Sequence, residues 1–289
     1  MITASAPGKI NLYFAVGPKL VNGYHEVCSV YLALNLREVV SVQFSEQTEI
    51  SVRGSLSQEQ LLSVPTDDTN LVVVAGKLLS DRSMSFEITK NVPVAGGMGG
   101  GSADAAAALI AIQALTGTEI QSDAVKLGAD VPFAIMGLLA LGVGVGEQLT
   151  KLEMKTELHI VLITTDVGLS TPMVYQRLDE LREKEDLLPE FKPPTPVDLI
   201  DALARGDVAA IAKLAHNDLQ RAALSLKPEL QETIDRALNA GALTALVSGS
   251  GPTIFAIAES ENSAHRIASE FGKFATVTSG PAAGARLEN

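Results

Sequence analysis

A cluster of glycines that runs directly into a run of alanines constrains this chain more than any other feature. Residues 93–108 read PVAGGMGGGSADAAAA, with five glycines in the six positions 96–101. Glycine admits positive φ and lets backbone N–H groups approach a ligand without interference from a Cβ. Alanine is the strongest helix former. The sequence therefore predicts a close-fitting loop followed by a helix from residue 102 to about residue 115.

This loop and helix together favour binding of a phosphate. The first turn of a helix presents free N–H groups and the positive end of the helix dipole, and both attract an anion. The loop lacks the Gly-Lys-Ser/Thr ending of a Walker A loop, and Ser102 stands where a dinucleotide-binding loop has glycine or alanine. A flexible turn is the alternative, but a turn needs only one or two glycines. We expect Ser102 to cap the helix, with Asp104 in its first turn.

Composition and charge exclude several classes of partner. The chain has 289 residues, 46% of them hydrophobic, and a formal net charge of −12. This length predicts two lobes with a good core, and the acidic balance argues against nucleic-acid or anionic-membrane partners. The single cysteine, Cys28, excludes an internal disulfide and a cysteine-based zinc site. The N-terminus has no signal-peptide pattern, and the uncharged stretch 130–147 is too short to cross a bilayer. We therefore expect a cytoplasmic protein.

The order of the predicted elements indicates an α+β fold, because strands and helices mix without regular alternation. In the first strand, Ile10, Leu12 and Phe14 should share one face and Lys9, Asn11 and Tyr13 the other. Asn22-Gly23 predicts a hairpin turn. Further strands are expected at 24–36, 39–44, 49–53, 85–89, 159–165, 245–256 (with a central turn) and 275–278, and helices at 70–79, soon after 122, and at 171–185, 196–203, 208–215, 228–240 and 263–271. A charged segment at 151–157 predicts the boundary between two domains, 1–153 and 154–289.

Two charged residues, Lys9 and Asp130, are candidates for acting on the phosphate if the fold brings them to the loop. Lys9 follows a Pro-Gly turn at the start of a strand, and Asp130 lies in an apolar setting where an unpaired carboxylate is costly. Taken alone, Lys9 is more often a solvated surface residue, and Asp130 is more often a turn or cap residue. Together beside a phosphate loop they suit phosphoryl transfer. The carboxylate takes the proton of an acceptor hydroxyl and the ammonium offsets charge on the moving group.

Three motifs taken in order resemble the GHMP kinase superfamily. They are PGKINL at 7–12, the loop at 93–106 and SGSGPT at 248–253. The resemblance implies a two-lobed GHMP kinase fold with the active site between the lobes. It implies an N-terminal kinase domain at 1–153, a C-terminal one at 154–289, and the use of ATP and Mg²⁺. A monomer or weak homodimer is expected.

Further motifs resemble one branch of that superfamily, whose members phosphorylate a cytidine-diphosphate-linked methylerythritol in non-mevalonate isoprenoid biosynthesis. These motifs are NGYHE at 22–26, LGADVPF at 127–133 and STPMVY at 170–175. The resemblance implies transfer of a phosphoryl group to the 2-hydroxyl of that small-molecule substrate. Two alternatives stay open: a GHMP kinase for homoserine, a mevalonate-type alcohol or a sugar, and a nucleotide-binding relative with impaired catalysis.

The resemblance also implies roles for individual residues. Asp130 corresponds to the catalytic base and Lys9 to its partner. Asn70 and Lys90 correspond to adenine-binding positions. The residues implied to bind the rest of the substrate are Asn11 and His25, by hydrogen bonds, and Tyr24 and Tyr175, by enclosing the cytosine. The residues implied to surround the ATP phosphates are Pro93, Val94, Ala95, Gly96, Gly97, Met98, Gly99, Gly100, Gly101, Ser102 and Ala103. No residue is assigned as a dedicated metal ligand, although Ser102 is a weaker candidate for a magnesium contact.

The chain departs from the family pattern at two places. The segment 116–126 is several residues short, and Leu138, Leu139, Val143 and Val145 stand where relatives have polar or cationic residues. If those side chains support the cleft, the departures predict reduced activity.

Overall fold

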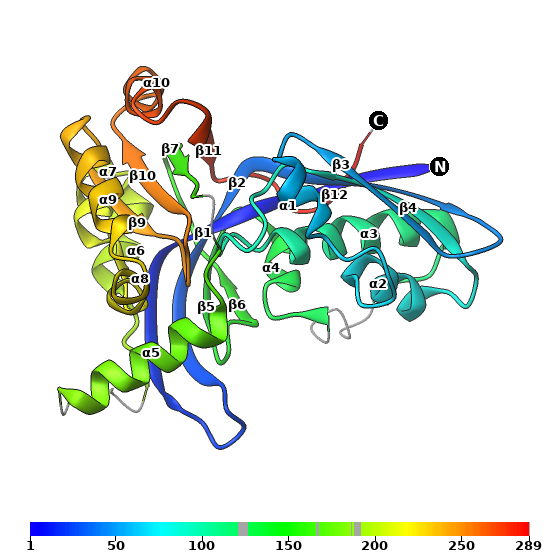
Figure 1. The fold of residues 1–289 in the computed structure, drawn as a ribbon, viewed down its shortest axis with the longest axis horizontal. Helices are drawn as coiled ribbons and strands as arrows, with labels where there is room; N and C mark the ends of the chain where they lie inside the picture. Colours follow the sequence, from blue (N-terminus) through cyan, green and yellow to red (C-terminus); the bar gives the residue numbers. More distant parts are fainter. Residues whose placement is uncertain (121–126, 166–167, 186, 188–191, 289) are drawn as a thin grey trace.

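A computed structural model describes residues 1–120, 127–165, 168–185, 187 and 192–288. These residues form two β-sheets, each with helices packed against it (Figure 1). The first sheet runs β12–β1–β2–β4–β3, with β5 beside β2, β6 beside β5, and β8 beside β1. Its strands are β1 (Ile2–Lys19), β2 (His25–Phe44), β3 (Glu49–Gly54), β4 (Met84–Lys90), β5 (Leu139–Val143), β6 (Gln148–Lys151), β8 (His216–Asn217) and β12 (Arg286–Leu287). The second runs β11 (Ala275–Gly280), β7 (Leu158–Ile163), β10 (Ile254–Ala258), β9 (Thr244–Val247).

The long antiparallel pair β1–β2 connects the two lobes (Figure 1). Its turn contains the predicted Asn22-Gly23 pair, with Gly23 at φ +86°, a conformation in which glycine has no steric penalty. Beyond the turn, the two strands predicted at 24–36 and 39–44 form the single strand β2.

The predicted alternation along β1 is wrong at Phe14. Asn11 pairs with Tyr31 but Tyr13 pairs with Val30, so the register shifts by one residue between them. Such a bulge moves every later side chain to the opposite face of the sheet. Ile10 and Leu12 therefore pack in the cluster shared by the two sheets, whereas Phe14 packs with the C-terminal helices.

The glycine–alanine segment forms α3 (Gly100–Thr116), which is buried along most of its length. The helix packs against β1, β2, α2 (Leu71–Leu79) and α4 (Val131–Met136). Small alanine side chains permit these close approaches. The predicted cap is wrong, because Gly99 in the left-handed region (φ +68°) precedes the helix and no side chain caps it. The helix ends where Gly117 takes φ +77°.

The remaining longer helices belong to the lobe that contains the second sheet (Figure 1). They are α5 (Thr171–Lys184), α6 (Val197–Arg205), α7 (Val208–Leu214), α8 (Gln220–Leu226), α9 (Glu229–Asn239) and α10 (Glu261–Ser269). A short helix α1 (Gln58–Leu62) and a 3₁₀ turn (Gly272–Phe274) complete the described elements. Apolar side chains from both sheets, among them Leu12, Leu32, Leu162 and Phe255, form one shared core cluster, so the two lobes pack firmly together.

The α+β fold is confirmed, and the helices predicted at 70–79, 171–185, 196–203, 208–215, 228–240 and 263–271 are each present to within about two residues. The sequence did not predict α1, α4, α8, β5, β6, β8 and β12. The short helix expected after residue 122 falls partly outside the described residues. β12 pairs with β1, so residues near the C-terminus join the first sheet. The domain division at 153 stays a prediction. Within the described chain, no helix is long and apolar enough to cross a membrane.

Candidate active site

A cavity of about 910 Å³ lies where the glycine loop, β1, β2 and α5 meet, a volume typical of small-molecule sites. The predicted residues that line it are Lys9, Asn11, Tyr24, His25, Asn70, Lys90, Pro93, Val94, Ala95, Gly96, Gly97, Met98, Gly99, Gly100, Gly101, Ser102, Asp130 and Tyr175. Ala103 is the exception. It lies fully buried in the core, and its N–H donates to the Gly99 carbonyl, so its placement does not support a direct ligand contact.

The glycine loop can hold its shape only with glycine at key positions. Gly97 has φ +75°, and a Cβ there would lie 2.1 Å from the carbonyl oxygen of Ser248. The loop therefore packs directly on the predicted 248–253 turn of the second lobe. A Cβ on Gly99 would lie 3.4 Å from both Asp130 Oδ2 and Lys9 Cγ. The loop, the lysine and the aspartate thus form one compact site.

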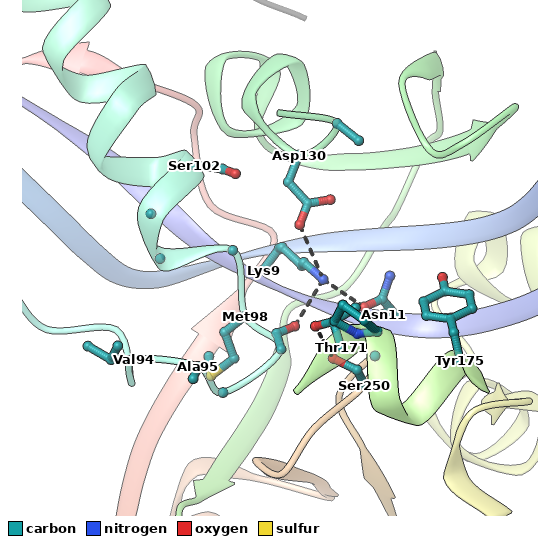
Figure 2. A pocket seen from close by; sticks show the side chains of 18 of the residues that line it. Lys9, Asn11, Val94, Ala95, Met98, Ser102, Asp130, Thr171, Tyr175 and Ser250 are labelled. Atoms are coloured by element: carbon teal, nitrogen blue, oxygen red, sulfur yellow. Dashed lines mark hydrogen bonds and ion pairs between the residues drawn. The ribbon is translucent and has the colours of Figure 1, made fainter. Parts of the chain in front are cut away.

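The Lys9 ammonium is fixed by three oxygen atoms (Figure 2). It donates to Asn11 Oδ1 and to the Gly97 carbonyl, both at 2.9 Å, and its Nζ lies 3.6 Å from Asp130 Oδ2. Asn11 is held in turn, because its Nδ2 donates to Ser29 Oγ at 2.7 Å. The bulge in β1 begins directly after Asn11, so Lys9 and Asn11 keep their shared face at this point.

Tyr31 is a cavity residue that sequence reasoning missed. Its ring centroid lies 5.7 Å from Lys9 Nζ, a cation–π distance. Burial and, secondly, the charge of Asp130 raise the pKa of this phenol well above its usual value. A Cβ at Gly142 or Gly146 would lie 2.5 Å from an atom of the Tyr31 side chain. The repeated glycines at 142–146 are the sequence signal of a bulky neighbour at this place, but they do not indicate that the neighbour is Tyr31.

Four side chains line the end of the cavity away from the glycine loop, and three of them contact one another in sequence. The rings of His25 and Tyr175 lie 4.9 Å apart, and His25 Nε2 lies 2.9 Å from Asp179 Oδ1. Burial, and then the charge of Asp130, raises the pKa of Tyr175. Tyr24 lines the same end but is 65% exposed. Asp179 was not predicted, although it lies four residues after Tyr175 and therefore on the same helix face.

A buried ionic cluster lies beneath the start of α3. Lys90 Nζ lies 2.5 Å from Glu38 Oε1 and 2.6 Å from Asp104 Oδ2, and all three residues are at most 3% exposed. The Asn91 N–H donates to Glu38 Oε2, whereas Asp104 Oδ1 has no hydrogen-bond partner among the described residues. A Cβ on Gly100 would lie 3.2 Å from Glu38, so the cluster supports the loop from below.

Burial dominates the protonation of this cluster. It raises the pKa of Glu38 to about 8, with help from the charge of Asp104, and it raises the pKa of Asp104 to about 6. Burial lowers the pKa of Lys90, but the two carboxylates more than offset this, so the lysine pKa lies above its ordinary value. At neutral pH the cluster therefore holds the Lys90 ammonium and about one ionised carboxylate, mainly that of Asp104.

These shifts predict a pH-dependent stability. Because the folded pKa of Glu38 lies above its unfolded value, the folded state binds the proton more tightly, and the free energy of unfolding falls as pH rises toward about 8. One such group contributes a slope of at most about 1.4 kcal/mol per pH unit. Urea unfolding between pH 6.5 and 8 should show a flatter dependence for Glu38→Gln than for the unmodified chain. Glu87→Gln, at a half-exposed carboxylate on β4, is the control; equal slopes in all three proteins contradict the prediction.

Only one of the four apolar departures reaches the cavity. Val145 lines it and is 37% exposed. Leu139 is buried in the core, whereas Leu138 and Val143 are half-buried away from the cavity lining. The predicted loss of activity therefore rests mainly on Val145. The shortened segment 116–126 lies partly outside the described residues.

The sequence matches the profile of the GHMP kinases N terminal domain at residues 70–138 and that of the GHMP kinases C terminal domain at residues 199–276. The chain belongs to the GHMP kinases, as the three motifs predict. It is 43% identical, over 99% of its length, to the 4-diphosphocytidyl-2-C-methyl-D-erythritol kinase of Pseudarthrobacter chlorophenolicus, of which the match covers 94%. The predicted likeness to that branch of the family is confirmed.

Solved structures agree with this placement. A crystal structure of 4-(cytidine 5'-diphospho)-2C-methyl-D-erythritol kinase matches with a TM-score of 0.78 at 30% identity, covering 96% of this chain and 98% of that one. A homoserine kinase from Cytophaga hutchinsonii matches with a TM-score of 0.71 at 20% identity, covering 99% of this chain and 97% of that one. The second likeness concerns the fold alone.

Proposed function

We propose that this protein transfers the γ-phosphoryl group of ATP to the 2-hydroxyl of 4-diphosphocytidyl-2-C-methyl-D-erythritol, a step of non-mevalonate isoprenoid biosynthesis. The observation that carries the proposal is the meeting of Lys9 and Asp130 at the glycine loop, in a cavity that continues to His25 and Tyr175. The names of the relatives at 43% and 30% identity support the same substrate. The expected cytoplasmic location and the monomeric or weakly dimeric state stay predictions.

The start of α3 fits the phosphates of ATP. No side chain caps this helix, so the amides of its first turn remain available to an anion at the positive end of the dipole. For the adenine, Asn70 and Lys90 have limited free capacity. Asn70 already accepts from the Val72 N–H and donates to the Pro65 carbonyl, and Lys90 pairs with two carboxylates. A hydrogen bond from either residue to the adenine would use the remaining side-chain N–H, on the Asn70 amide or the Lys90 ammonium.

Mg²⁺ is proposed to accompany ATP, where it would offset phosphate charge. The Ser102 hydroxyl and the Asp130 carboxylate line the cavity and are oxygen donors of the type that this ion prefers. Within the described residues, no group of three or more His, Cys, Asp or Glu side chains is placed to hold a metal ion.

In the proposed reaction, an oxygen of the Asp130 carboxylate takes the proton of the substrate 2-hydroxyl while the oxygen of that hydroxyl attacks the γ-phosphorus. The bond from the γ-phosphorus to the β,γ-bridging oxygen breaks, and ADP leaves. Lys9 keeps the carboxylate in place through its own anchors on Asn11 and Gly97, and its positive charge offsets charge on the transferred group. Because both Asn11 side-chain atoms are already bonded, we assign Asn11 first to holding Lys9. Its substrate contact stays a prediction.

A coupled ADP-release assay with a panel of alcohols tests the proposal. With ATP and saturating Mg²⁺, we expect turnover of the cytidyl substrate and none of homoserine or mevalonate. Turnover of either of those without the cytidyl compound would refute the assignment. ATP binding by calorimetry without turnover of any alcohol would instead indicate the nucleotide-binding relative that Val145 suggests.

A further inference from the structure

The His25–Asp179 pair forms a fixed hydrogen-bonding unit at the end of the cavity away from the glycine loop. His25 is the first residue of β2, Asp179 lies on α5, and both line the cavity. The His25 side chain is 4% exposed and that of Asp179 is 34% exposed. The Tyr175 ring packs 4.9 Å from the imidazole, so the histidine is held on one side by an aromatic face and at its tip by a carboxylate.

The carboxylate decides which ring nitrogen carries the proton. An ionised carboxylate can only accept hydrogen bonds, so the 2.9 Å contact requires the hydrogen on His25 Nε2. In a neutral imidazole, Nδ1 is then a bare acceptor. Among the described residues no hydrogen bond to Nδ1 is present, and its acceptor capacity remains available to a ligand in the cavity.

A bare ring nitrogen distinguishes the two common pyrimidines. Cytosine carries a 4-amino group, which donates hydrogen bonds, whereas uracil carries a 4-oxo group, which only accepts them. A site that presents an acceptor binds the first and places two acceptors against each other with the second. Buried groups left unpaired in this way are the main source of discrimination between similar ligands.

We propose that Asp179 is the residue that sets the choice of cytosine over uracil, by fixing the hydrogen on His25 Nε2 so that Nδ1 accepts from the 4-amino group. This inference rests on the proposed function. Asp179 acts through His25 and is a positioning residue. If it only tied α5 to β2, its loss would weaken both pyrimidine ligands alike.

The decisive variant is Asp179→Asn. Its amide can turn either its oxygen or its nitrogen toward Nε2, so the ring hydrogen is no longer confined to Nε2 and Nδ1 is no longer held as an acceptor. Asp179→Ala removes the carboxylate altogether, so either ring nitrogen of His25 can carry the hydrogen. In calorimetry the unmodified protein should bind CDP more tightly than UDP. In each variant the ratio of the two affinities should fall by about tenfold, the size of one net hydrogen bond.

A matched control is Glu180→Gln, which changes the adjacent carboxylate on α5. Glu180 pairs with Arg177 on the helix surface and does not line the cavity, so the CDP:UDP ratio should stay unchanged. Nitrogen-15 NMR of the unmodified protein should show the hydrogen on Nε2 and a bare Nδ1. A hydrogen on His25 Nδ1, or an unchanged ratio in both Asp179 variants, would overturn the proposal.

The same experiments separate this inference from the proposed function. If the unmodified protein turns over the cytidyl substrate but the Asp179 variants keep the full CDP:UDP ratio, the function stands and the role of Asp179 falls. If the unmodified protein neither prefers CDP nor turns over the cytidyl substrate, the proposed function itself has failed.

Discussion

Replacing Asp130 with asparagine is expected to lower kcat for the cytidyl substrate by about 10²–10⁴-fold, the range for loss of a positioned base. The amide has nearly the same shape but cannot take the hydroxyl proton. The surroundings of the side chain should survive the change, because the contacts that fix Lys9 to Asn11 and Gly97 do not involve Asp130. The loss should therefore fall on kcat, while the affinity for ATP changes little.

Steady-state kinetics with saturating substrates, together with calorimetry of ATP, measure the two effects separately. Asp68→Asn is the matched control, since the Asp68 side chain is 74% exposed and its ion pair among the described residues is with Lys77 on the surface. That variant should keep full turnover. Turnover of Asp130→Asn within a few-fold of the unmodified enzyme would remove Asp130 from the proposed mechanism.

Local sequence chemistry predicted the glycine loop well, because the conformations it requires are properties of single residues. The positive φ of Gly97 and Gly99 and the alanine helix that follows depend on little beyond the segment itself. The meeting of Lys9 and Asp130 is a different matter. It depends on how α4 packs against α3 and β1, and only the family resemblance placed the two side chains together.

The residues that were missed share a physical cause. Phe14 lies on the opposite face from the predicted one because a bulge shifts the register of β1, and no local sequence pattern predicts that bulge. Tyr31 and Asp179 become site residues only through neighbours distant in the chain. Glu38 and Asp104 lie on separate elements and pair through Lys90. In the sequence each of these charged side chains resembles an ordinary surface residue.

That ionic cluster leads to the largest expected effect on stability. The Lys90 ammonium contacts both buried carboxylates. In Lys90→Met, Glu38 and Asp104 keep their buried positions and lose the ammonium that balances them. Removing one partner from a buried ion pair costs about 3–5 kcal/mol, because the remaining charge cannot return to water. We expect a decrease of that size in the free energy of unfolding at neutral pH.

Urea unfolding of Lys90→Met should be compared with that of Lys77→Met, which makes the same change in an exposed pair. Lys77 and Asp68 lie 2.8 Å apart with side chains 58% and 74% exposed, and such surface pairs contribute under about 1 kcal/mol. The Lys90 ammonium lowers the pKa of Asp104, so in Lys90→Met this carboxyl takes up its proton at a higher pH than in the unmodified chain. The loss should therefore shrink as the pH falls toward about 6, the folded pKa of Asp104 in the unmodified chain, and should change little below that pH. A loss no larger than that of Lys77→Met, or one that does not change with pH, would mean that the cluster does not hold the balance of charge described above.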